Sequence, residues 1–187
     1  VAPLPPYGRA GTRHWLEEIT GALPAPREKE VQKELSRVEK EDFLRLNEIK
    51  SMWGELWFDE ALVRAPSSMA WGLARALRTE WADVRRLAVA AEAEEAADAA
   101  GIADEVFSET RTAELAQFLA SMKNGLLLAS SNEAAQVAPQ HAQFLPVASP
   151  VLDRIQLTDA PFMGLRGSRF IEEQLWNGHI LRRQWML

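Results

Sequence analysis

The chain has 187 residues, 47% of them hydrophobic and 26% charged, which is typical of one globular domain rather than of a disordered protein. Its formal net charge of −6 argues against general binding to nucleic acid, because phosphate binding requires a concentrated basic surface. Cysteine is absent, so disulfide bonds, thiolate metal ligands and a cysteine nucleophile are all excluded.

Residues 1–11 contain three prolines and two glycines, and proline lacks the backbone donor that helices and sheets use. This segment is therefore predicted to be an extended arm. The chain begins at Val1 without Met, which removal of a targeting segment would explain, as would trimming of the chain. We expect a soluble or peripheral protein, and an organelle is the location that a removed targeting segment would imply. A short helix is predicted next, with Thr12 as its N-cap and Gly21 as its end.

The longest predicted helix lies between Pro26 and Pro66, because no proline interrupts this span. Apolar residues recur there every three or four positions, as on one face of a helix. Trp53 and Trp57 continue this stripe, and we expect both inside the protein. Gly54 between them is expected to bend the helix or to let another backbone approach closely.

Two further helices are predicted in the middle of the chain. The first starts at Ser67, carries an apolar stripe and then an alanine-rich stretch, and ends at Gly101. The second spans about residues 111–123 and ends at Asn124-Gly125. Residues 92–114 hold eight acidic side chains against one basic side chain, which predicts an acidic surface patch.

Prolines interrupt every periodic run between residues 129 and 167, yet apolar residues keep appearing there. The segment is too apolar for a solvated linker, so it is predicted to be an extended strap lying on a surface, with a short strand at 153–157. Residues 168–187 are predicted to form a C-terminal helix, while the dipeptide Asn177-Gly178 leaves a hairpin as the alternative.

Together these elements predict a mainly α protein, a small bundle of about four to five helices. Four segments are expected along the chain, namely an extended arm at 1–11, a helical domain at 12–128, an extended apolar strap at 129–167 and a C-terminal helix or hairpin at 168–187.

The sequence offers no recognisable catalytic or metal site. His14, His141 and His179 are widely separated, and none stands in a zinc-binding pattern. A nucleophile elbow, a phosphate-binding loop and a dinucleotide-binding glycine turn are all missing. We therefore predict no catalytic residue, no metal, no cofactor and no enzymatic activity.

Two short motifs resemble polyketide synthases. Leu4-Pro5-Pro6-Tyr7 followed by Arg13-His14-Trp15-Leu16 resembles the linker that closes the acyltransferase region, and Trp71-Gly72-Leu73-Ala74-Arg75 resembles a stretch in the structural half of the ketoreductase domains. The resemblance implies an enzyme fragment that binds a nicotinamide cofactor. The chain departs from this family because Tyr7 is its only tyrosine, so the ketoreductase proton donor is missing, and no catalytic residue is transferred.

Seven tryptophans are many for this length, and Trp is favoured where proteins anchor on one another. A domain this small cannot bury the whole apolar strap, so we predict a non-catalytic accessory subunit that stabilises a larger multiprotein assembly, such as an organellar photosynthetic or respiratory membrane complex. The predicted partner-binding residues are Trp71, Phe144, Leu145, Phe162, Met163, Trp176 and Trp185.

The expected partners are protein subunits and not nucleic acid. The chain is expected to have no transmembrane span of its own, because its apolar runs are far shorter than the roughly 20 residues that cross a bilayer. Two alternatives stay open, a helical module that binds an apolar ligand such as a lipid or pigment, and the polyketide-synthase-like enzyme fragment.

Overall fold

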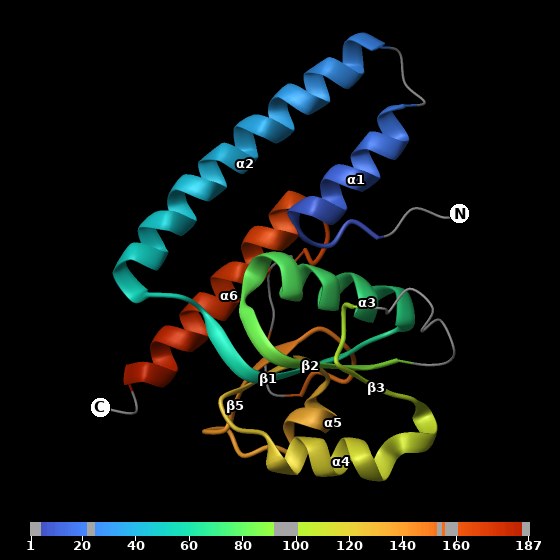
Figure 1. The fold of residues 1–187 in the computed structure, drawn as a ribbon, viewed down its shortest axis with the longest axis vertical. Helices are drawn as coiled ribbons and strands as arrows, with labels where there is room; N and C mark the ends of the chain where they lie inside the picture. Colours follow the sequence, from blue (N-terminus) through green and yellow to red (C-terminus); the bar gives the residue numbers. More distant parts are fainter. Residues whose placement is uncertain (1–4, 22–24, 92–100, 153–154, 156–160, 185–187) are drawn as a thin grey trace.

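The computed structural model describes residues 5–21, 25–91, 101–152, 155 and 161–184, and it shows a parallel β-sheet covered by helices on both faces (Figure 1). All strand pairs of the described residues are parallel, in the order β3-β2-β1-β4-β5. The prediction of a mainly α bundle is therefore wrong, and the fold is α/β. The strands are β1 (Trp57–Arg64), β2 (Asp83–Ala90), β3 (Glu105–Phe107), β4 (Gly125–Ala129) and β5 (Ala142–Pro146).

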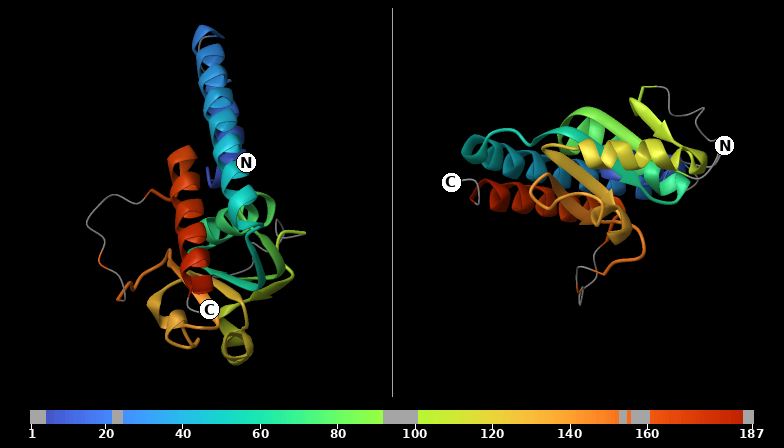
Figure 2. Two further views of the ribbon diagram at one scale, coloured as in Figure 1. Left: turned by 90° about the vertical axis from the view of Figure 1, so that its left-hand side faces the viewer. Right: turned by 90° about the horizontal axis from the view of Figure 1, so that it is seen from below.

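The helices form one layer on each side of this sheet. The upper layer in Figure 1 contains α1 (Gly8–Thr20), α2 (Ala25–Trp53), α3 (Ser67–Ala76) and α6 (Gly164–Gln184). The lower layer contains α4 (Thr112–Ser121) and α5 (Ser131–Ala134). A π-helical segment, η1 (Leu77–Trp81), continues α3, and a short 3₁₀ helix, η3 (Glu109–Arg111), precedes α4. Figure 2 shows that α2 projects well beyond the sheet.

The strand order reverses direction once. The chain moves outward from β1 through β2 to β3, and then returns to place β4 on the other side of β1, followed by β5. Strand β1 thus pairs with β2 through Val63↔Val89 and with β4 through Val63↔Leu128. In an open parallel sheet of this kind, the loops at the carboxyl ends of the strands diverge where the order reverses, and ligands bind in the crevice that results.

The sequence pattern of these strands predicts helix or strap because the strands are buried on both faces. Ala61 and Val63 belong to the core shared with α3 and α6, whereas Leu62 belongs to the core shared with α4. All three are fully buried, as are Leu126 and Leu128 in β4. A strand buried on both faces reads as a continuous apolar run without alternation, and such a run is hard to distinguish from a buried helical segment.

The long helix predicted between Pro26 and Pro66 is interrupted by a turn at Gly54. Helix α2 ends at Trp53, since Gly54 adopts a φ of +83°, a left-handed conformation that disfavours other side chains. The chain then begins β1 at Trp57. Trp53 is partly buried against the core, but Trp57 is 51% exposed, so the expectation that Trp57 lies inside is wrong.

The second predicted helix also contains a strand. Residues 67–81 are helical, but Ala82 is extended and β2 follows from Asp83, so the predicted continuous helix to Gly101 is wrong. Its apolar stripe is instead divided between α3 and the buried end of β2, where Leu87, Ala88 and Val89 have no exposed surface. Part of the predicted acidic patch, residues 92–100, lies outside the described residues.

The predicted strap at 129–167 is not a strap either. It contains the helix α5 and the edge strand β5, which pairs with β4 along its whole length. Of the strand predicted at 153–157, only Ile155 lies within the described residues, and it is exposed. The C-terminal segment is a helix, and Gly178 lies inside it, where its lack of a Cβ lets α6 pack closely on the Gln143 side chain of β5.

Candidate functional site

A cleft of about 500 Å³ lies at the carboxyl edge of the sheet. It extends across the point between β1 and β4 where the strand order reverses, the place at which open parallel sheets bind their ligands. Every strand ends at its wall. The lining residues are Arg64, Ala65, Pro66, Met69, Ala90, Ala91, Phe107, Ser108, Thr112, Leu115, Ser130, Asn132, Glu133, Val147, Ala148 and Ser149.

A pair of opposite charges stands at the centre of this edge. Arg64 is the last residue of β1, and its Nη1 lies 2.9 Å from Oε1 of Glu133 in α5. The Glu133 side chain is 5% exposed, whereas the Arg64 side chain is 47% exposed. The pair therefore has a fixed, buried anion and a cation that still faces the cleft.

The Glu133 carboxylate is held by the cap of its own helix. Its Oε2 accepts hydrogen bonds from the Ser130 backbone N–H at 3.0 Å and from the Ser130 hydroxyl at 2.6 Å. Ser130 Oγ in turn accepts from the Asn132 backbone N–H at 3.2 Å, which completes a capping box. Because one oxygen of Glu133 serves the cap and the other serves Arg64, the turn after β4 fixes the position of the cation on β1.

The wall on the β3 side is aromatic and carries hydroxyl groups. Phe107 packs against Phe118 of α4 with ring centroids 5.6 Å apart, and the Arg111 guanidinium lies 5.1 Å above the Phe107 ring. Ser108 and Thr112 add hydroxyl groups at the rim.

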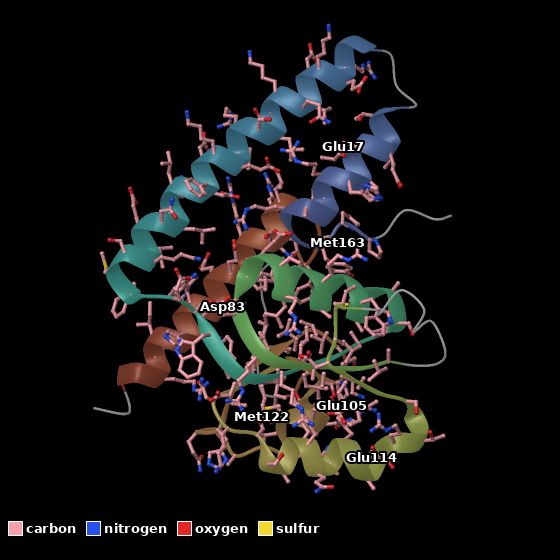
Figure 3. All side chains as sticks on the ribbon, viewed as in Figure 1. Glu17, Asp83, Glu105, Glu114, Met122 and Met163 are labelled. Atoms are coloured by element: carbon pink, nitrogen blue, oxygen red, sulfur yellow. The ribbon has the colours of Figure 1, made fainter. Side chains whose placement is uncertain are left out.

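Arg111 is balanced by two carboxylates, unlike Arg64. It pairs with Glu105 at 3.4 Å and with Glu114, and Figure 3 shows these two acids on the same side of the sheet as α4. Pairing with Glu114 raises the pKa of Arg111 and lowers that of Glu114. Arg64 is thus the cation of this edge with the most capacity left for an anionic ligand.

The cleft lacks the glycine turn that cradles a dinucleotide. Between β1 and α3 the chain reads Ala65-Pro66, and the first glycine after β1 is Gly72, inside the helix. A Cβ at Gly72 would collide with the Tyr7 ring, so this glycine serves the packing of the N-terminal segment on α3. The carboxyl edge is therefore suited to an anionic group through Arg64 rather than to a pyrophosphate held by backbone amides.

A metal–sulfur centre does not fit the residues of this chain. Such clusters are held by cysteine thiolates, and the chain has no cysteine. Among the described residues, no group of three or more His, Asp or Glu side chains is placed to hold a metal ion.

A second charged cluster lies away from the cleft, where α1, α2, η1 and α6 meet. Arg9 pairs with Asp42 at 3.2 Å and with Glu172, and the backbone N–H groups of Arg9 and Ala10 donate to the Glu80 carboxylate at 2.6 and 2.9 Å. Burial lowers the pKa of Arg9, but its bonds to Glu172 and Asp42 outweigh that effect and raise it. Burial raises the pKa of Glu172. These contacts join four helices, so we interpret the cluster as structural.

The predicted partner-binding residues occupy different environments. Trp71, Leu145 and Trp176 are buried in the chain's own core, and Phe144 packs against the core on the α4 side. Phe162 is partly buried beside Phe170, whereas Met163, labelled in Figure 3 just before α6, is 53% exposed. Trp185 lies outside the described residues. Their binding to a partner stays a prediction.

Sequence reasoning missed Arg64 and Glu133. The signal for Glu133 was present in Ser130-Ser131-Asn132-Glu133, which has capping-box spacing directly after an apolar run. Arg64 had no such signal, since its role depends on the pairing of β1 with β4.

Within the described residues, no helix combines the length and apolarity needed to cross a bilayer.

Two of three comparisons found known proteins that are similar to the chain. A family model described as "Nitrogenase component 1 type Oxidoreductase" matches residues 2–179. A solved structure titled "Nitrogenase Cp1 at pH 6.5" matches with a TM-score of 0.69 and 14% sequence identity, which shows a common fold. The match covers 95% of this chain and 39% of that chain. Among curated proteins no match was found.

Proposed function

Because the chain belongs to the nitrogenase component 1 type oxidoreductase family, we propose that it supplies a ligand-binding domain of an oxidoreductase, with the cleft at the carboxyl edge as its binding site. The prediction of a non-catalytic accessory subunit is wrong, as is the prediction that the chain is no enzyme, because the family match covers nearly the whole chain. The helical module for an apolar ligand is excluded by the α/β fold, and the matching family is not the polyketide synthases.

One observation carries this proposal. Arg64 faces a cleft at the reversal of the strand order, and its guanidinium is positioned by a buried carboxylate that the Ser130 cap fixes. A guanidinium has five N–H donors, and Glu133 engages only part of this set. The remaining donors suit a carboxylate or phosphate group, so the ligand we propose is an anionic part of the substrate or of an organic cofactor.

The redox-active group of the reaction would come from outside the described residues. The lack of cysteine, together with the lack of a metal-binding cluster in the described part of the chain, supports this division of roles. Arg64 would bind and orient the anionic group of the ligand. The apolar side chains of Met69, Phe107 and Leu115 would exclude water from the part of the ligand next to that group. No step of electron transfer is assigned to this chain.

The expectation of protein partners also remains a proposal. The chain spans 39% of the length of the solved nitrogenase chain, so other segments or subunits would complete the enzyme. Support for a partner surface comes from the exposed apolar residues between β5 and α6, of which Leu152 is 78% and Ile155 87% exposed. The organellar location predicted from the sequence is likewise a proposal.

The test is Arg64→Gln in the oxidoreductase that contains this chain. We expect KM for an anionic substrate to rise about tenfold or more, since a charge-assisted pair is lost. If the anion is instead a tightly bound cofactor, we expect the purified variant to contain less of it. The matched control is Arg85→Gln, because Arg85 is 84% exposed near the amino end of β2. Unchanged KM, kcat and cofactor content in the Arg64 variant would refute the proposal.

A further inference from the structure

A second pocket, of about 570 Å³, lies at the opposite edge of the sheet, where the strands begin. Four segments converge on it: the turn between α2 and β1, the residues that precede β4 and β5, and the last turns of α6. Figure 1 shows the end of α2 and the carboxyl-terminal half of α6 on the same side of the molecule. The lining residues are Trp53, Gly54, Glu55, Trp57, Asn124, Gln140, His179 and Arg182.

The pocket has aromatic walls because of the turn at Gly54. Trp53 ends α2 and Trp57 begins β1, and the turn at Gly54, which has a left-handed conformation, places both tryptophans on the lining of one pocket. Trp57 is 51% exposed, although burying an indole is strongly favourable. The imidazole of His179 adds a third ring, set edge to face against Trp176 with centroids 6.2 Å apart.

The pocket also contains a cation, Arg182, that has no carboxylate partner among the described residues. The partly buried Arg182 donates from Nη1 to the Gly125 carbonyl and from Nη2 to the Gln140 carbonyl, each over a long 3.4 Å. Within the described part of the chain, no carboxylate lies within ion-pairing distance of it. The nearby acid, Glu55, is engaged by Lys50 at 2.8 Å.

The surroundings of Arg182 in the described structure disfavour its positive charge. Burial lowers the pKa of Arg182, because desolvation penalises its charged form and the two carbonyl oxygens compensate only in part. An anion that entered the pocket would remove this penalty. A guanidinium also binds planar carboxylates in a bidentate geometry, and indole faces bind flat aromatic rings.

We propose that this amino-edge pocket is a second binding site, specific for a small aromatic anion, in which Arg182 pairs with the acid group and Trp53 and Trp57 contact the ring. The site is distinct from the carboxyl-edge cleft, since the two share no lining residue and lie at opposite ends of the strands. The inference does not depend on the proposed function, and a failure of one leaves the other intact.

The experiment is a titration of the protein with naphthoate, followed by the indole N–H signals in ¹H–¹⁵N NMR spectra. We assign the two signals of interest with Trp53→Phe and Trp57→Phe variants. Naphthoate is expected to shift both signals in a saturable manner, whereas naphthylmethanol, which has the same ring and no charge, is expected to bind at least about tenfold more weakly.

Two variants separate the site from general binding of aromatic compounds. Arg182→Gln is expected to weaken naphthoate binding about tenfold and to leave naphthylmethanol binding unchanged. Arg85→Gln, the control, is expected to bind both compounds as the unmodified protein does. Two results would overturn the proposal: equal binding of naphthoate by the Arg182 variant, or saturable shifts confined to tryptophans other than Trp53 and Trp57. If Arg182→Gln unfolds, Arg182→Lys replaces it, and because Lys lacks the guanidinium fork its naphthoate binding must still be weaker.

Discussion

The two edges of the sheet treat a positive charge in opposite ways. At the carboxyl edge, Arg64 meets Glu133, a buried carboxylate that a helix cap holds in place. At the amino edge, Arg182 meets two backbone carbonyl oxygens and, among the described residues, no carboxylate. A cation near a cleft can therefore be held in two ways. It can be positioned by a fixed carboxylate of the protein, as Arg64 is, or it can have only carbonyl partners and be neutralised when a ligand binds, as we propose for Arg182. Four substitutions probe these two edges, two of them the charges and two the packing and the turn of the amino edge, from the largest expected effect to the smallest.

The largest effect is expected from Glu133→Ala, which makes the carboxyl edge resemble the amino edge. The change removes the partner of Arg64 and leaves the Ser130 N–H and hydroxyl without their acceptor, so we expect the free energy of unfolding to fall by about 2–3 kcal/mol. Urea denaturation measures this. Gln136→Ala in the same turn is the control, since Gln136 is exposed. If Glu133→Ala unfolded at the same urea concentration as the unmodified protein, the buried carboxylate would not stabilise the carboxyl edge.

Gly178→Ala tests how tightly α6 closes the amino edge. A Cβ at this position would collide with the Gln143 amide, whose Nε2 donates to the carbonyl oxygens of Gln174 and Leu175 at 3.1 Å. We expect a loss of about 1–2 kcal/mol, measured by thermal or urea unfolding.

The background variant Gln143→Ala provides the control for that prediction. In the Gln143→Ala background, the amide that would collide with the new Cβ is absent. Because alanine is a better helix former than glycine, Gly178→Ala should then be neutral or stabilising. Equal costs in the two backgrounds would show that the Gln143 contact is not the cause.

Gly54→Ala tests the turn that brings the two indoles together. No atom lies within 4 Å of the added Cβ, so the only cost is the left-handed backbone, about 1 kcal/mol in the free energy of unfolding. Gly54→Asn is the matched variant, because asparagine tolerates this conformation better than alanine does. If the two variants lost the same stability, backbone strain would not explain the glycine.

The smallest effect, and the one of opposite sign, is expected from Arg182→Met. This change keeps most of the aliphatic stem and removes a partly buried charge that has no carboxylate partner among the described residues, so we expect stability to rise by about 0.5 kcal/mol. A measurable destabilisation would mean that the long carbonyl contacts already satisfy the guanidinium. The comparison between the two edges would then lose its basis.

Local signals in the sequence located some elements correctly. The helix predicted at about 111–123 corresponds to α4, and Asn124, which follows it, adopts a positive φ of 42° before the next strand. The C-terminal segment forms the helix that was favoured over a hairpin. Both elements carry apolar residues at helical spacing, so periodicity was informative about their type, although α6 starts at Gly164 and continues past Gly178.

The sheet was not predictable in the same way. Its strands are short apolar runs such as Leu126-Leu127-Leu128, which are buried on both faces and show no alternation. Strand β2 follows directly on a helical segment, so the apolar residues of the two elements form one continuous pattern in the sequence. The candidate site was missed for the same reason, since Arg64 and Glu133 are far apart in sequence and meet only because β1 pairs with β4.

The sequence by itself determined that the chain folds, that it has no thiolate chemistry, and where several helices start and stop, because composition, caps and glycines act locally. Only the tertiary structure decided that its apolar runs form a parallel sheet, and that two arginines far apart along the chain stand at opposite edges of it. The physical reason is that parallel strand pairing and the burial of charge depend on contacts between distant segments, which no local pattern records.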